Sequence, residues 1–127
     1  MRVITNNPLA EKVLVEKGLC RVEYRPCAFR DILVAARDEI HKGYRLLTHP
    51  LSGSVKPNET HYKSLGLSDE PAKTLDFNSL DLIEQSIIAC DKFPLKYPVL
   101  PDNIREDFQL VDLTLILSVF DGNGVDK

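Results

Sequence analysis

The run Arg2-Val3-Ile4-Thr5-Asn6-Asn7-Pro8 joins a short β-branched segment to the start of a helix. β-Branched residues favour a strand over the first part of this run. Asn7 is a suitable N-cap, and Pro8 fits the first helical position because proline lacks the amide that would be unpaired there. Gly18 is placed to end the helix in the left-handed conformation. The N-terminal part therefore predicts a strand followed by a helix.

The alternation of strand and helix continues along the chain. Residues 19–24 read as a second strand, and apolar residues recur at helical spacing from Phe29 to Ile40. Residues 44–48 resume as a third strand. A βαβαβ order implies parallel strands with right-handed crossovers. The sequence predicts a small three-layer, Rossmann-like α/β domain with a short parallel sheet of order 2-1-3, followed by C-terminal helices.

Two further helices are predicted in the C-terminal half. Asn78 or Ser79 can cap the first, and Asn103 with Glu106 resembles a capping box for the second. Residues 111–120 also alternate with the period of a strand and are rich in β-branched residues. A helix is the prediction for this segment, and a strand is the alternative.

A helix over residues 110–120 would be apolar around most of its circumference. An exposed apolar face of that kind marks an interface, and a two-fold dimer is the commonest soluble homo-oligomer. We therefore expect a homodimer through residues 110–120. Complete burial of this segment inside one monomer is the alternative.

Composition places the chain among soluble globular proteins with one domain, residues 1–127. It has 43% hydrophobic and 28% charged residues, a net charge of -3 and a pI near 5.6. The acidic balance argues against nucleic-acid binding, which normally requires a basic stripe. No apolar run approaches the roughly 20 residues needed to span a bilayer, and no signal peptide is evident. Three widely separated cysteines form no disulfide framework, so we expect a cytoplasmic protein with reduced thiols.

In a sheet of order 2-1-3, ligands bind at the switch point beyond the carboxyl ends of strands 1 and 3. The segments that follow these two strands would meet there. Gly53 lies between two serines and permits a turn whose amides and hydroxyls form an anion-binding nest. Lys56 would add positive charge. The predicted ligand-binding residues are Asn6, Asn7, Thr48, His49, Ser52, Gly53, Ser54, Lys56 and Asn58.

Other interpretations of this loop remain open. The Ser-Gly-Ser run is common in plain turns. His49 could act as a general base for Ser52 or Ser54, and with His61 and Glu59 it could bind a metal. No orienting acid and no standard nucleotide motif accompanies them. We therefore assign no catalytic residue, no metal and no cofactor, and we expect Cys27 and Cys90 to behave as small buried hydrophobes.

Two strings carry a family resemblance. The opening Val3-Ile4-Thr5-Asn6-Asn7-Pro8 and the run Leu47-Thr48-His49-Pro50-Leu51-Ser52-Gly53-Ser54-Val55-Lys56-Pro57-Asn58-Glu59-Thr60 resemble the GrdX family. The resemblance extends over most of the chain. This family comprises small proteins found alongside glycine, sarcosine and betaine reductase components in anaerobic amino-acid-fermenting bacteria.

The resemblance implies an accessory role in reductase expression, assembly or maintenance, and it carries over no catalytic residues. We expect the protein to bind a small anionic ligand or a reductase-system protein at the loop after the third strand. A small enzyme that uses His49, Ser52 or Ser54, and Lys56 on a phosphorylated or carboxylated metabolite is the alternative. A pure protein-interaction module is a third possibility.

Overall fold

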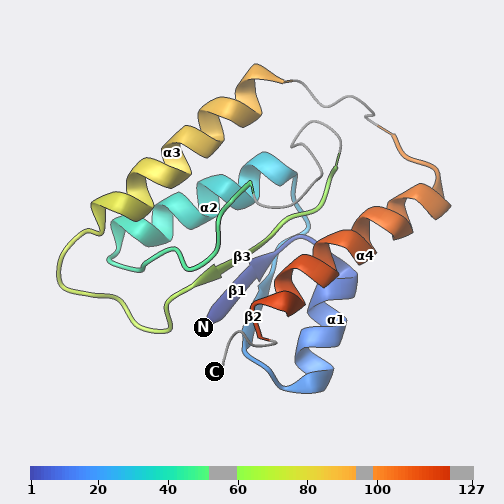
Figure 1. The fold of residues 1–127 in the computed structure, drawn as a ribbon, viewed down its shortest axis with the longest axis horizontal. Coiled ribbons are helices and arrows are strands. Elements are labelled where there is room, and N and C mark those ends of the chain that lie inside the picture. The colour runs from blue at the N-terminus through green and yellow to red at the C-terminus, as the bar shows by residue number, and fades with distance from the viewer. Residues whose placement is uncertain (52–59, 94–98, 121–127) are drawn as a thin grey trace.

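The computed structural model describes residues 1–51, 60–93 and 99–120. Strands and helices alternate in its first part, and two helices complete it (Figure 1). In chain order the elements are β1 Arg2–Thr5, α1 Pro8–Lys17, β2 Arg21–Tyr24, α2 Phe29–His41, β3 Ser64–Leu67, α3 Phe77–Lys92 and α4 Asp102–Ser118.

Within the described part of the chain, β1 is the central strand of a sheet with the order β2-β1-β3. β1 and β2 run parallel, with Val3 opposite Val22. β1 and β3 run antiparallel, with Val3 opposite Gly66. The α/β class and the order 2-1-3 are confirmed, whereas the prediction of a wholly parallel sheet is wrong.

The third strand is also a different segment from the predicted one. Residues 44–48 lie along the outer edge of β3, where the Leu47 amide donates to the Gly66 carbonyl at 2.8 Å. β3 occupies the place beside β1 because its two leucines, Leu65 and Leu67, are completely buried in the core. Residues 44–48 form only an isolated bridge, with Leu46 opposite Leu67, so the prediction of a third strand at 44–48 is wrong.

Helices cover both faces of the sheet. Successive side chains of a strand point to opposite faces, so Ile4 packs with α2 and α3 while Val3 packs with α1 and α4. Figure 1 shows α2 beside α3 and, across the sheet, α1 beside α4, in agreement with the contacts of each pair. The expected three layers are present, with a separate apolar core on each face.

The start and end of α1 follow the prediction. The Asn7 side chain accepts a hydrogen bond from the Leu9 amide at 3.0 Å, and Pro8 occupies the first turn. Gly18 ends the helix with a φ of 62°, in the left-handed region that glycine adopts without steric cost.

The two C-terminal helices begin elsewhere than predicted. The N-cap of α3 is Asp76 and that of α4 is Pro101, two or three residues ahead of the predicted caps. The hydroxyl of Ser79 is used differently, because it donates to the Asp76 carboxylate at 2.5 Å and accepts from the Leu46 amide at 2.9 Å. The predicted caps that are wrong are Asn78, Ser79 and Asn103.

α4 is helical through Ser118, so the strand alternative for residues 111–120 is wrong. Its inner side buries Leu113 and Ile116 against α1 and the sheet, together with the carboxylate of Asp112. Among the described residues, no helix combines the length and the apolar content needed to cross a bilayer.

Candidate functional site

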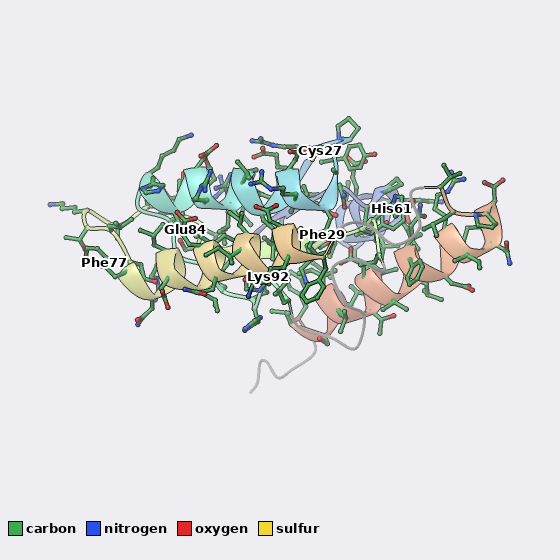
Figure 2. All side chains as sticks on the ribbon, turned by 90° about the horizontal axis from the view of Figure 1, so that it is seen from above. Cys27, Phe29, His61, Phe77, Glu84 and Lys92 are labelled. Carbon is green, nitrogen blue, oxygen red and sulfur yellow. The ribbon has the colours of Figure 1, made fainter. Side chains whose placement is uncertain are left out.

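A cavity of about 430 Å³ opens beyond the carboxyl ends of β1 and β2, between the start of α2 and the end of α3. We refer to it as the cleft. Figure 2 shows Cys27, Phe29 and His61 near the start of α2, in the middle of that view. Its lining combines aromatic side chains, two thiols and polar groups. The residues on which the argument depends are Cys27, Phe29, His61, Tyr62, Cys90 and Phe93.

Asn6 joins the two walls of the cleft. Its side-chain amide donates to the Cys27 carbonyl at 2.9 Å and to the His61 carbonyl at 2.7 Å. Its Oδ1 accepts from the Lys63 amide at 2.8 Å. Asn6 lines the cleft, but its amide group is already engaged in holding backbone segments together.

The two thiols of the cleft are held in their neutral form. Burial raises the pKa of Cys27, and the carboxylate of Asp31 raises it further. Burial also raises the pKa of Cys90, together with Asp91. Since the thiolate is the nucleophilic form of cysteine, these thiols behave as soft apolar lining, which agrees with the expectation from sequence.

The other side of the sheet holds a buried polar cluster centred on Asp112 of α4. Its carboxylate accepts from the Ser64 amide at 3.0 Å and from the Ser64 hydroxyl at 2.6 Å. Because the serine proton goes to Asp112, the Thr5 hydroxyl donates to Ser64 Oγ at 2.7 Å. Thr5 Oγ1 in turn accepts from the Asn7 amide at 2.9 Å. The four residues form one directed chain of hydrogen bonds.

Asn7 connects this cluster to two helices. While its Oδ1 caps α1, its Nδ2 donates to the Gln109 carbonyl and to Asp112 Oδ2, both at 2.9 Å. The predicted ligand-binding residue Asn7 is thus completely buried and serves as a structural link between α1 and α4.

Lys63 borders a second, much smaller cavity of about 30 Å³ beside the same cluster. Thr48, Ser64 and Asp112 line it as well, and Ile116 lies on its apolar side. Lys63 is only 6% exposed, and its ammonium has no hydrogen-bond or ion-pair partner among the described residues. Burial lowers the pKa of Lys63, and the attraction of Asp112 offsets this effect only in part. We refer to this site as the Lys63 cavity.

The predicted site residues are therefore divided between two places. Asn6 lies at the cleft, whereas Thr48 and Asn7 lie at or beside the polar cluster on the opposite face. Thr48 Oγ1 accepts from the Gly66 amide at 3.0 Å. His49 lies in neither cavity, and its Nδ1 accepts from the Leu51 amide at 3.0 Å. Ser52, Gly53, Ser54, Lys56 and Asn58 lie outside the described residues.

The alternatives from sequence receive no support from the described part of the chain. The bond to Leu51 occupies one ring nitrogen of His49, and the serines proposed as nucleophiles are not described. No group of three potential metal ligands occurs among the described residues. Glu59, which the metal hypothesis requires, lies outside them.

The sequence interpretation missed two residues of the polar cluster and its cavity, Asp112 and Lys63. Asp112 had a signal, since it is the one carboxylate in the apolar run of α4 and faces inward. Lys63 had none, because a lysine next to a serine in a polar segment is ordinarily a solvated surface residue.

Replacing Lys63 by methionine should stabilise the protein at pH 7. The pKa of Lys63 is lowered on folding, so the amine binds its proton less favourably in the folded state than in the unfolded chain. The protonated amine therefore reduces stability at pH 7. This penalty falls as pH rises through the folded-state pKa toward the ordinary lysine value. The melting temperature of Lys63→Met should therefore exceed that of the wild type at pH 7, and the difference should shrink at alkaline pH. Lys12→Met, at an exposed position of α1, is the control, and its melting temperature should be close to that of the wild type. A melting temperature of Lys63→Met below that of the wild type at pH 7 would contradict the burial of an unfavourable charge at Lys63.

Comparison with known proteins identifies the family of this chain. The family model of the GrdX-like proteins matches residues 2–121, which is nearly the whole chain. No curated protein and no solved structure matches it. The match confirms the resemblance seen in the two sequence strings. The chain belongs to the GrdX-like protein family.

Proposed function

We propose that this protein is a cytoplasmic accessory protein of glycine, sarcosine or betaine reductase systems and that it binds a small polar ligand in the cleft. The observation that carries the proposal is the cavity of about 430 Å³ at the carboxyl ends of β1 and β2. Sites for small molecules have volumes of roughly 300 to 1,000 Å³ and occur at this edge of α/β sheets. The parallel β1-α1-β2 unit supports this location for a ligand site.

The lining of the cleft favours binding over catalysis. Its thiols are kept protonated, and Arg30 at the rim is paired with Asp91 through bonds of 2.6 and 3.1 Å. Phe29 and Phe93 supply apolar surface, and the rings of His61 and Tyr62 lie 6.4 Å apart. A few polar groups in a largely apolar cavity are typical of small-molecule sites, and protonated thiols and a paired arginine supply no activated nucleophile.

The two cleft thiols offer a direct test of occupancy. Glycine, sarcosine and betaine, each compared with an equal concentration of sucrose, should slow the alkylation of Cys27 and Cys90 by iodoacetamide. At a ligand concentration ten times Kd, occupancy should reduce the rate about tenfold, because only the open site reacts. Peptide mapping by mass spectrometry measures each cysteine separately.

Cys20 is the internal control, since burial raises the pKa of its thiol too, yet it packs with α1 on the other face of the sheet. Its alkylation should not change. If none of the three compounds protects Cys27 or Cys90, the proposed ligand class is wrong. Equal protection of all three cysteines would indicate general stabilisation and not occupancy of the cleft.

We also propose that the outer side of α4 mediates self-association. Leu110, Val111 and Val119 are exposed to 55%, 37% and 39%, so the helix is not fully covered within one monomer.

The wild type should sediment as a concentration-dependent dimer at micromolar concentration, and Leu110→Glu should shift it to the monomer. Ile88→Glu, at an equally exposed position of α3, should leave the dimer intact. A wild type that sediments at 14.3 kDa at all concentrations would contradict the dimer.

A further inference from the structure

Lys63 is a buried amine that still reaches solvent. Among the described residues, Arg2 Nε is the only fully enclosed side-chain nitrogen or oxygen without a hydrogen-bond partner. The Lys63 ammonium also has no such partner there, so its Nζ is not fully enclosed, and Lys63 is one of the residues that line the Lys63 cavity. An amine in this position is unusual, because buried lysines are normally paired with a carboxylate.

The charged surroundings of Lys63 favour a positive charge at this position. Asp112 is the charged group of the described chain that attracts its ammonium, and it lies beyond ion-pair distance. The Asp112 carboxylate is itself fixed by Asn7 and Ser64, so it remains a stationary counter-ion. Lys63 and this fixed negative charge thus line the same cavity.

The cavity has room for very little beyond the amine. One water-sized sphere occupies about 10 to 15 Å³ by this measure, so 30 Å³ accommodates two or three non-hydrogen atoms. An ordinary metabolite does not fit. Atoms added to the nitrogen by a one- or two-carbon carbonyl compound do fit, because condensation expels the carbonyl oxygen as water.

We propose that Lys63 is a covalent binding site for an aldehyde of one or two carbons, which it holds as an iminium ion opposite Asp112. This site lies on the other face of the sheet from the cleft and does not depend on the function proposed for the cleft.

The chemistry balances without a redox partner. The neutral amine forms a bond from Nζ to the carbonyl carbon, and the carbonyl oxygen gains a proton to give a carbinolamine. The carbon–oxygen bond then breaks, the oxygen leaves as water with a second proton, and a carbon–nitrogen double bond remains. Overall, an ammonium and an aldehyde become an iminium and one water, so the positive charge facing Asp112 is unchanged.

Neighbouring groups support this sequence of proton movements. Thr48 lines the cavity, and its hydroxyl accepts from the Gly66 amide, a bond that does not use the hydroxyl's own proton. That proton can assist the departing hydroxyl. The lowered pKa of Lys63 increases the neutral, nucleophilic fraction of the amine about tenfold for each unit by which it falls.

Reductive trapping tests the proposal on the intact protein. The wild type is treated at pH 7 with substoichiometric formaldehyde or acetaldehyde and sodium cyanoborohydride, and modified lysines are located by peptide mapping. Lys63 should be alkylated several times faster than the exposed Lys12 and Lys73. Benzaldehyde, which exceeds the volume of the cavity, should show no preference for Lys63.

Two controls separate a folded site from intrinsic reactivity. The preference for Lys63 should vanish in concentrated urea, where the cavity no longer exists. In Lys63→Arg, the rapidly alkylated lysine should be absent, and the other lysines should react at their wild-type rates. Alkylation of Lys63 at or below the rate of Lys12 in the native protein would overturn the proposal. A preference for Lys63 that persists in urea would overturn it as well.

Discussion

The arrangement of the layers depends on the hydrogen bonds that the buried carboxylate of Asp112 accepts. Asp112 is only 6% exposed, and its carboxylate accepts three hydrogen bonds from Asn7 and Ser64. Through them, α4 is attached to β3 and to the junction of β1 with α1. A buried carboxylate without such donors would strongly oppose folding, so the sheet must present Ser64 and Asn7 at this place. The position of α4, and with it the Lys63 cavity, follows from that requirement.

β1 is fixed at both of its ends by polar contacts to opposite helical layers. At its amino end, Arg2 donates to Glu39 of α2 at 2.6 Å, and its guanidinium lies 4.5 Å from the centre of the Tyr44 ring. Burial alone would raise the pKa of Glu39, but hydrogen bonds from Lys42 and Arg2 outweigh it and hold the pKa below its ordinary value. At its carboxyl end, Asn6 supports the cleft and Asn7 supports the Asp112 cluster. Two consecutive asparagines therefore position the two candidate sites, one on each face of the sheet.

The parts of this fold that could be predicted are those governed by local chemistry. The cap at Asn7, the left-handed end at Gly18 and the amphipathic α2 require no knowledge of distant contacts. β3 was missed because it has only four residues, among them Gly66, a residue type depleted in strands. A side chain at Gly66 would overlap Met1 and press on Thr48. That constraint arises only after distant segments have packed. The same applies to the site: Asn6 and Asn7 were recognised as important, but their partners Cys27, His61 and Asp112 are brought to them by tertiary structure.

The most direct test of this account is the free energy of unfolding of Asp112→Asn measured beside that of Asp107→Asn. Both substitutions remove one charge from α4, but Asp107 is exposed whereas Asp112 accepts three buried hydrogen bonds. The account predicts a loss of about 2 kcal/mol or more for Asp112→Asn and a change within about 0.5 kcal/mol for Asp107→Asn. It also predicts that Asn7→Ala costs less in the Asp112→Asn background than in the wild type, because the two side chains share one hydrogen bond. Equal effects of the two aspartate substitutions, with full additivity to Asn7→Ala, would contradict the central role of Asp112.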